Sequence, residues 1–229
     1  MTDIKEMFSS IAPRYDLLNC LLSMGRDKYW RRVAVDQLKL ISGEKYLDVA
    51  TGTGDMAVEI VRQGVADIHV TAADFSKNMI DFGEKKIKKL HFENWIKFHL
   101  ANSENLPFED NSFHSAVCAF GVRNFSDQSK GIKEMRRVIK KKGRIVILEF
   151  SNPGNRFFRF LYYFYFKKVL PLIGGLISGK LSAYRYLPDS VLNFYSSEEL
   201  KLIMKKAGLK NINYFTLTFG IVTVHTGYK

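Results

Sequence analysis

The chain has 229 residues, of which 46% are hydrophobic and 25% charged, proportions typical of a globular protein with a full core rather than of a disordered chain. Its two cysteines, Cys20 and Cys118, exclude a disulfide framework and a metal site of the paired-cysteine type. The net charge of +12 is compatible with nucleic acid, with an anionic membrane surface or with solubility alone, so charge does not decide the function.

The N-terminus, MTDIKEMFSS, carries acidic residues and lacks the apolar core of a signal peptide. No stretch reaches the roughly 18 uncharged apolar residues that a membrane-spanning helix needs. These two features predict a cytoplasmic protein.

The first two thirds of the chain alternate between short apolar runs and amphipathic stretches. Residues 2–40 have a mainly helical pattern, and a glycine turn leads into the first apolar run. Strands are predicted at 46–50, 68–73, 95–100, 113–120 and 144–150, and helices at 56–62, 76–90 and 128–140. Because strands and helices alternate, the pattern predicts a parallel sheet with helices on both faces.

The pattern changes after residue 151. Residues 156–187 are aromatic and basic and predict an inserted, mainly helical lobe. A helix is predicted at 196–207, with Ser197 as its cap. The last stretch, 211–229, contains two β-rich runs and predicts a terminal hairpin. Together these patterns predict a seven-stranded sheet whose last strand runs antiparallel beside the fifth.

The sharpest local motif follows the first predicted strand and reads DVATGTGD at 48–55. Gly52 and Gly54 let the backbone turn tightly and let a ligand approach the main chain. Three interpretations compete. The motif is a plain turn, a dinucleotide site (Gly52, Gly54 and Ala57 fit GxGxxA), or a site for S-adenosylmethionine.

Charge separates the two ligand classes. Asp48 and Asp55 flank the glycines and repel a pyrophosphate, whereas the sulfonium and amino groups of S-adenosylmethionine are cations that both carboxylates attract. The predicted terminal hairpin also favours a methyltransferase over a dehydrogenase. The sequence therefore favours S-adenosylmethionine as the cofactor, while the other two interpretations stay open.

Polar residues after the next two strands are further candidates for cofactor binding. Asp74 ends the second strand, where a carboxylate can accept hydrogen bonds from both hydroxyls of an adenosine ribose. Asn102 and Ser103 follow the third strand, where they can hydrogen-bond the adenine edge or form an ordinary polar turn.

Six longer motifs run through the chain in order. They are YDLLN at 15–19 with Ser23 and Trp30, LDVATGTGD at 47–55, NLPFEDNSF at 105–113, FGVRNF at 120–125, RVIKKKGRIVILEFS at 137–151 and TFGIVTVHTGYK at 218–229. Together they resemble the ubiquinone/menaquinone biosynthesis C-methyltransferase family (UbiE/MenG) over nearly the whole chain. The chain departs from the family pattern at several positions. Asp27 stands where the family has histidine, Leu18 where it has methionine and Ala119 where it often has serine. Lys141 and Lys142 stand where the family usually has proline and glycine.

The resemblance implies a class I S-adenosylmethionine-dependent methyltransferase, an α/β fold with a Rossmann-like seven-stranded sheet and a C-terminal β-hairpin. It implies methyl transfer to a ring carbon of a polyprenyl quinol. Demethylmenaquinol is the expected acceptor, with the benzoquinol step of ubiquinone biosynthesis as a further one. It also implies that Thr53, Asp74, Asn102 and Ser103 bind the cofactor. Another small lipophilic acceptor stays open as an alternative.

The chemistry of a quinol ring points to catalytic candidates. A ring carbon becomes nucleophilic when the adjacent hydroxyl loses its proton, which requires no covalent intermediate and no metal ion. Arg123 and Asn124 follow the fourth strand. Arg123 can stabilise the phenolate or relay its proton through a water, and Asn124 can orient the ring oxygen. The alternative is a structural turn with a surface arginine. Tyr15 can close over the site from the N-terminal lid, or it packs in the core.

The aromatic lobe suits a long apolar substrate tail. Its residues 157–166 are too apolar on all sides for an exposed helix. The basic residues that flank them are Arg156, Arg159, Lys167, Lys168 and Lys180. This combination favours peripheral contact with an anionic membrane surface at its inner face, and a helix buried against the sheet is the alternative. Because the aromatic residues cluster with aliphatic ones, no nucleic-acid contact is expected.

We expect one domain over 1–229 with four segments. They are a helical lid at 1–40, a cofactor-binding half at 41–151, a substrate and membrane lobe at 152–195, and a C-terminal helix with the hairpin at 196–229. A homodimer is compatible with the sequence.

Overall fold

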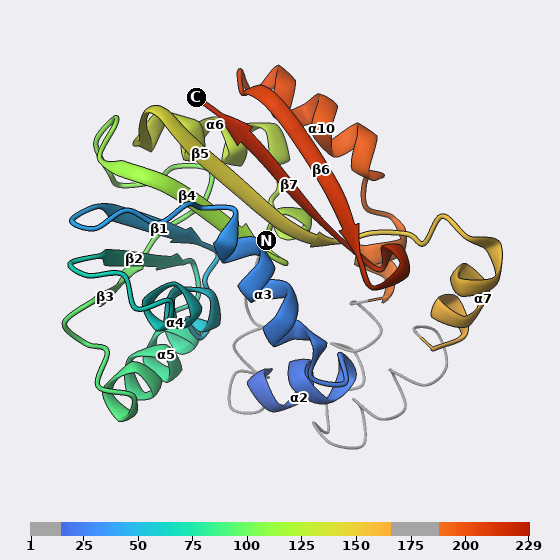
Figure 1. The fold of residues 1–229 in the computed structure, drawn as a ribbon, viewed down its shortest axis with the longest axis horizontal. Coiled ribbons are helices and arrows are strands. Elements are labelled where there is room, and N and C mark those ends of the chain that lie inside the picture. Colours follow the sequence, from blue (N-terminus) through green and yellow to red (C-terminus); the bar gives the residue numbers. More distant parts are fainter. Residues whose placement is uncertain (1–14, 166–187) are drawn as a thin grey trace.

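The described residues, 15–165 and 188–229 of this computed structural model, build one seven-stranded sheet (Figure 1). The strands are β1 (Lys45–Val49), β2 (His69–Asp74), β3 (Ile96–Leu100), β4 (Phe113–Ala119), β5 (Ile139–Phe150), β6 (Lys210–Leu217) and β7 (Val222–Tyr228). Their order in the sheet is β3-β2-β1-β4-β5-β7-β6. The first five strands are parallel, and β7 runs antiparallel to both β5 and β6. The predicted seven-stranded sheet, with its last strand antiparallel beside the fifth, is confirmed.

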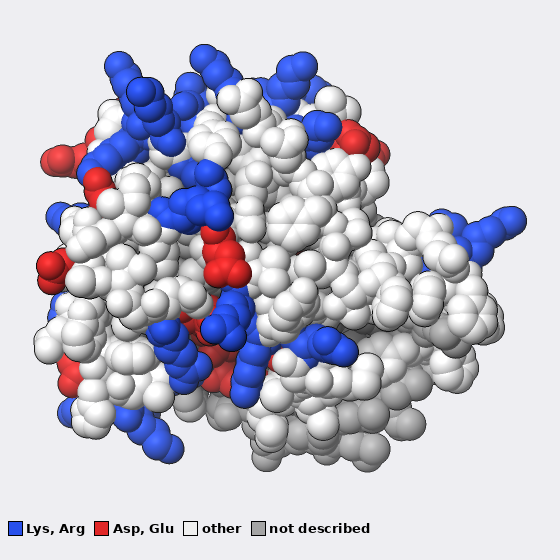
Figure 2. Space-filling view, in the orientation of Figure 1, with Lys and Arg blue, Asp and Glu red and all other residues white. Residues whose placement is uncertain are grey.

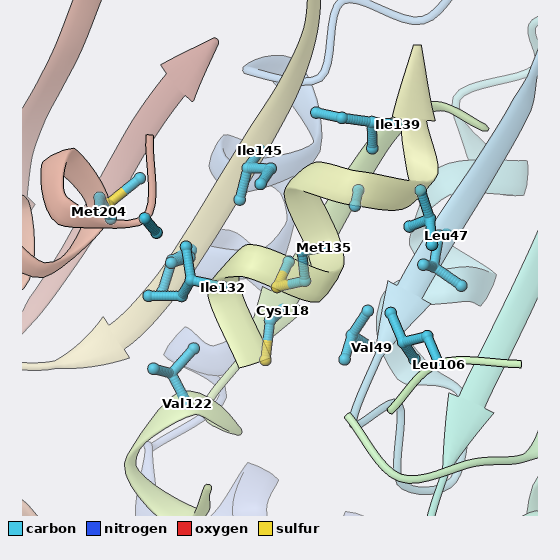
Figure 3. Packing of buried hydrophobic residues seen from close by; sticks show 14 of the residues in the cluster. Leu47, Val49, Leu106, Cys118, Val122, Ile132, Met135, Ile139, Ile145 and Met204 are labelled. Carbon is cyan, nitrogen blue, oxygen red and sulfur yellow. The ribbon is translucent and has the colours of Figure 1, made fainter. Parts of the chain in front are cut away.

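Helices cover both faces of the sheet. The helices of the described residues include α2 (Tyr15–Leu22), α3 (Arg26–Asp36), α4 (Asp55–Arg62), α5 (Lys77–Lys89), α6 (Gln128–Val138), α7 (Arg156–Phe164) and α10 (Ser197–Lys206), with short 3-10 helices η2 (Val122–Asn124) and η4 (Thr218–Gly220). One face is packed by α3, α4 and α5. The other is packed by α6 and α10, whose Met135 and Met204 lie over the strands (Figure 3). Successive side chains of a strand point to opposite faces of the sheet, so Leu47 belongs to the core under α6 and Tyr46 to the core under α3.

Side-chain caps fix where several helices begin. The Ser76 hydroxyl accepts a hydrogen bond from the Met79 amide at the start of α5. At the start of α10, Ser196 and Glu199 form a reciprocal capping box. The predicted helix at 196–207 is therefore confirmed, but its cap is Ser196 and not Ser197.

The junction between α6 and β5 differs from the prediction. The helix ends at Val138 and the strand begins at Ile139, five residues before the predicted start at 144. The side chain of Ile139 is buried and its backbone is extended, so the residue joins the sheet opposite Phe113. The register then shifts before Arg144 pairs with Ser115. The free energy gained by burying Ile139 against the sheet outweighs the helix propensity of the lysines that follow it.

Only parts of the predicted lid and lobe lie among the described residues. Helices α2 and α3 confirm the helical pattern for 15–36, and α7 confirms it for the start of the aromatic lobe. Residues 1–14 and 166–187, including Lys167, Lys168 and Lys180, lie outside the described residues. In the described part of the chain, no helix is long and apolar enough to cross a membrane.

Candidate active site

The turn between β1 and α4 uses backbone conformations that favour glycine. Gly52 and Gly54 both have positive φ, at 60° and 85°. A Cβ atom on Gly54 would lie 2.7 Å from the ring of Phe98, so the close approach of β3 adds a second reason for glycine here. The turn joins β1 directly to α4, and the predicted tight turn between a strand and a helix is confirmed.

Asp48 is the buried carboxylate under this turn. Its Oδ2 accepts hydrogen bonds from the Ala57 amide at 3.1 Å and from the Thr51 hydroxyl. Within the described residues, no group donates a hydrogen bond to its Oδ1. Burial raises the pKa of Asp48 to about 7, against the lowering effect of the two hydrogen bonds. A cation beside Oδ1 would favour the ionised carboxylate and give this oxygen a partner.

Asp74 ties the glycine turn to the end of β2. One carboxylate oxygen accepts a hydrogen bond from the Gly52 amide at 2.8 Å, and the other accepts one from the Ser76 amide at 2.9 Å. Burial raises the pKa of Asp74 above its ordinary value, and these backbone bonds act against the rise. Each carboxylate oxygen can accept a further bond, so Asp74 is placed to hold hydroxyl groups of a ligand as well.

Thr53 and Asp55 belong to an ionic network that joins the turn to the lid. The Thr53 hydroxyl donates to Asp16 on α2 at 2.5 Å and accepts from Lys86 Nζ at 2.9 Å. Asp55 pairs with Lys86 at 2.7 Å and with Arg31 at 3.2 Å. These two cations offset the charge of Asp55, so Asp48 is the better partner for a cationic ligand. Sequence reasoning missed this network, whose members lie in the glycine turn and on α2, α3, α4 and α5.

The lid departs from the family pattern at Asp27, and the structure gives this residue a packing role. Its buried carboxylate accepts hydrogen bonds from Arg31 at 2.5 Å and from the Ser23 hydroxyl at 2.9 Å. Asp27 thus holds Arg31 in place against Asp55.

The turn after β3 lies beside Asp74. The Ala101 amide donates to the Asp74 carbonyl at 2.8 Å. Ser103 is buried, whereas Asn102 is exposed and its side-chain oxygen accepts from the Glu104 amide at 2.9 Å. This bond is that of a polar turn, and it leaves the amide group of Asn102 for a ligand. The small cavity beside the glycine turn is lined by Asp48, Thr53 and Phe120 among others, and neither Asn102 nor Ser103 lines it.

The side chain of Arg123 is buried, in contrast to the surface arginine of the alternative interpretation. Its side chain is 5% exposed, and Nη1 donates to Glu149 Oε1 at 2.7 Å and to the Phe120 carbonyl at 2.5 Å. Asn124 Nδ2 donates to the same carbonyl at 3.5 Å. Because Phe120 lines the cavity beside Asp48, this turn connects Arg123 to the glycine turn. The partner Glu149, 26 residues further along the chain, was not predicted.

The remaining catalytic candidate, Tyr15, is the first residue of α2, and its side chain lies outside what the structure describes. Three aromatic rings join the lid to the ends of the strands instead. Trp30 on α3 packs edge-on against Phe120 and Phe150, and its indole N–H donates to the Thr218 hydroxyl at 2.8 Å. The lid helix, the carboxyl ends of β4 and β5, and the hairpin turn therefore meet at the site.

Comparison with known proteins assigns the chain to a family. The model of the ubiE/COQ5 methyltransferase family matches residues 1–229. The chain belongs to this family. The ubiquinone/menaquinone biosynthesis C-methyltransferase UbiE of Geotalea uraniireducens is 53% identical over 99% of this chain and 96% of its own length. The demethylmenaquinone methyltransferase of Deinococcus radiodurans is 43% identical over 99% of this chain and 92% of its own length.

The fold of this ubiE/COQ5 family member is that of class I methyltransferases. A solved S-adenosylmethionine-dependent methyltransferase from Aquifex aeolicus matches it with a TM-score of 0.66 at 18% identity, covering 93% of this chain and 96% of that one. The enzyme is an S-adenosylmethionine-dependent methyltransferase. The described residues fit that cofactor, because the buried Oδ1 of Asp48 suits a cationic group and the oxygens of Asp74 suit the ribose hydroxyls.

Proposed function

We propose that this methyltransferase methylates a ring carbon of a polyprenyl quinol, with demethylmenaquinol as its acceptor and the benzoquinol precursor of ubiquinone as a further one. The names of the two relatives support a quinone-type acceptor. The structural observation that carries the proposal is the buried Arg123, held beside the turn that also lines the cofactor cavity. A guanidinium at this place suits an acceptor that reacts as a phenolate.

The cofactor is held, in this proposal, by residues at the carboxyl ends of three neighbouring strands. They are Asp48, Gly52, Thr53, Gly54, Asp74, Asn102 and Ser103. Asp48 binds a cationic group through Oδ1, Asp74 binds the ribose hydroxyls, and the turn after β3 binds the adenine edge. Bound there, the cofactor supplies an electrophilic methyl group.

The acceptor is activated by residues that follow β4. Arg123 stabilises the negative charge that develops on the ring oxygen, and its buried surroundings strengthen that interaction relative to water. Asn124, which shares the Phe120 carbonyl with Arg123, orients the same oxygen. Tyr15 closes the site from the start of α2. These roles need the ring carbon to face the methyl group at near-attack distance, which the aromatic walls around Phe120 help to secure.

A second part of the proposal is that the protein makes peripheral contact with the anionic surface on the inner face of the membrane. Three aromatic residues of α7, Phe157, Phe160 and Phe164, are 65%, 68% and 57% exposed. Arg156 and Arg159 lie on the same helix. Figure 2 shows a largely uncharged surface over α7, with basic side chains at its outer end. Exposed aromatic and basic residues on one helix suit a lipid surface, where the substrate's polyprenyl tail is dissolved.

The distribution of lysines supports the expectation that nucleic acid is not a substrate. Exposed lysines gather at the start of β5, the end of α10 and the start of β6, along the upper edge of Figure 2. They include Lys141, Lys142, Lys205, Lys206 and Lys210. This is the amino end of the parallel strands, whereas Asp74 and Arg123 lie at the carboxyl end. A polyanion bound to these lysines would be held away from the site.

The test of the acceptor is a turnover assay with labelled S-adenosylmethionine and reduced naphthoquinol or benzoquinol acceptors that carry prenyl tails, read by mass spectrometry. We expect ring methylation of the naphthoquinol, and little product with Arg123→Ala. Binding of the cofactor without methylation of either quinol would contradict the proposal.

The test of membrane contact is flotation with anionic and neutral vesicles. We expect the protein to float with anionic vesicles, and a triple substitution of Phe157, Phe160 and Phe164 by serine to abolish this. Leu202→Ser, which changes an exposed leucine on α10, is the matched control. Equal flotation of the triple variant would exclude α7 as the contact surface. Light scattering of the protein without vesicles would detect a homodimer.

A further inference from the structure

Arg123 does not stand alone at the carboxyl end of β4, because a carboxylate from the neighbouring strand holds it. Glu149 on β5 accepts from Arg123 Nη1 at 2.7 Å through Oε1 and from the Arg123 backbone amide at 3.3 Å through Oε2. The Phe150 amide also donates to Glu149 Oε1, at 3.0 Å. We propose that Glu149 is a positioning residue that aims the Arg123 guanidinium at the acceptor, which deepens the role of Arg123 in the proposed function.

The geometry of the pair fixes the direction of the guanidinium. Nη1 donates to two acceptors, Glu149 Oε1 and the Phe120 carbonyl. The planar guanidinium therefore cannot rotate about the terminal bonds of the side chain without breaking one of these hydrogen bonds. The ring of Phe150 lies under the guanidinium, 5.5 Å from its central carbon. The carboxylate also holds the backbone of the same residue, so it fixes both ends of the arginine.

Burial argues that this pair is kept for a purpose other than stability. The side chains of Arg123 and Glu149 are only 5% and 1% exposed. Two charges that are taken out of water lose hydration free energy, and their mutual attraction only partly offsets this loss. Well-packed apolar residues often stabilise a core as well or better. A preorganised cation in a dry site, in contrast, gains strength toward a developing negative charge.

The surroundings of the pair already accommodate a phenol. Tyr162, on the inner side of α7, is buried, and both members of the pair act on its hydroxyl. Burial raises the pKa of Tyr162, the charge of Arg123 acts to lower it, and the charge of Glu149 acts to raise it. The same charges act on the buried thiol of Cys118 on β4, whose pKa burial also raises. The electrostatic field of the pair thus reaches a hydroxyl of the same chemical class as that of a quinol.

The test is a double-mutant cycle of wild type, Glu149→Gln, Arg123→Ala and the double variant. Single-turnover methyl transfer is measured at saturating quinol and cofactor, and cofactor affinity by calorimetry. We expect Glu149→Gln to lower kcat by about 10-fold or more, since a small misplacement of a catalytic group has effects of this size. The dissociation constant of the cofactor should stay within about twofold of wild type. The double variant should be no slower than Arg123→Ala, because Glu149 acts through Arg123.

Two further variants keep the result decisive. Glu149→Asp keeps the charge but withdraws the carboxylate by one methylene group. If Glu149→Gln does not bind cofactor, a lowered kcat of Glu149→Asp at normal cofactor affinity supports the proposal, and a wild-type kcat overturns it. Glu134→Gln changes an arginine–glutamate pair that is more exposed, with Arg137 on α6, and should leave kcat unchanged.

The outcomes separate this inference from the proposed function. If Arg123→Ala is slow and the double variant loses a further factor equal to that of Glu149→Gln, Glu149 does not act through Arg123 and only the inference is overturned. If Arg123→Ala keeps a normal kcat, the catalytic role of Arg123 fails and the inference fails with it.

Discussion

Replacement of Asp48 by asparagine separates the charge of the buried carboxylate from its shape. Burial raises the pKa of Asp48 from 3.8 to about 7. The folded chain therefore holds this proton more tightly than the unfolded chain does. Its contribution to stability is greatest below pH 4 and is lost as the pH rises to 7. At about 1.4 kcal/mol for each pKa unit, the ionised carboxylate costs roughly 4 kcal/mol above pH 7.

Asparagine removes this cost but leaves an amide where Oδ1 stood. A buried amide N–H without a partner costs about 1–3 kcal/mol, so the cofactor-free Asp48→Asn protein should be more stable than wild type at pH 8 by roughly 1–3 kcal/mol. Near pH 4, where the wild-type carboxyl is protonated, only the cost of the amide remains, so the variant should be less stable than wild type there by about 1–3 kcal/mol. Urea unfolding at several pH values measures the difference.

Cofactor binding should show the opposite effect. A cation beside Oδ1 binds the ionised carboxylate, so wild-type affinity should fall about tenfold per pH unit below pH 7, with a proton released on binding. Asp48→Asn should bind about 10–100-fold more weakly at pH 8, since a charge-assisted hydrogen bond is lost, and its affinity should lack this pH dependence. Asp81→Asn, which changes an exposed carboxylate on α5, is the control.

Calorimetry in buffers of different ionisation enthalpy counts the released proton. Comparison of wild type with the variant removes the titration of the cofactor itself. Equal pH dependence of cofactor affinity in both proteins would refute the assignment of Asp48 as the partner of the cation.

Three further expectations follow from the site and the core. Arg123→Ala should lower kcat about 100-fold at unchanged cofactor affinity, and Arg123→Lys should recover part of it, as single-turnover kinetics would show; a normal kcat would return Arg123 to a structural role. Asp74→Ala should weaken cofactor binding by about 2–4 kcal/mol in calorimetry, and an unchanged affinity would place the ribose elsewhere. Burial lowers the pKa of His225 from 6.5 to about 4. As the pH falls from 6.5 to 4, the unfolded chain therefore protonates this histidine before the folded chain does, and the free energy of unfolding decreases by about 3 kcal/mol. His225→Gln should remove that loss in acid unfolding, and an unaltered acid limb would show that the loss arises from other groups.

The parts of the fold that depend on local patterns could be predicted from the sequence. Alternating apolar runs and amphipathic stretches predicted the five parallel strands, and the β-rich end predicted β6 and β7. The glycine turn with Asp48 and Asp74 could be predicted because neighbouring parallel strands end at the same edge of the sheet. The early start of β5 at Ile139 could not, since the lysines that follow it fit a helix and only burial of Ile139 against the sheet decides.

Contacts between distant segments mark the limit of sequence reasoning at the site. The pairing of Arg123 with Glu149 requires that β4 and β5 lie side by side. The sequence predicted both strands but not their order in the sheet. Glu149 lies in the LEFS stretch of a family motif, an acidic residue in an otherwise apolar strand, and this was the available signal. The network of Lys86 with Asp16 and Asp55 gave no such signal, because Lys86 lies in a run of lysines that is typical of an exposed helix face.

The place of β7 has a consequence for how the enzyme is made. The strand lies inside the sheet, between β5 and β6, and yet it follows β6 in the chain and is synthesised after it. On the ribosome, β6 therefore leaves the exit tunnel before the strand that must join it to the sheet. The Trp30–Thr218 hydrogen bond spans 188 positions, so this contact of α3 also forms only after the hairpin turn has been made. A nascent chain that stalls before this turn has every proposed cofactor-binding residue but lacks the contact that joins α3 to the hairpin.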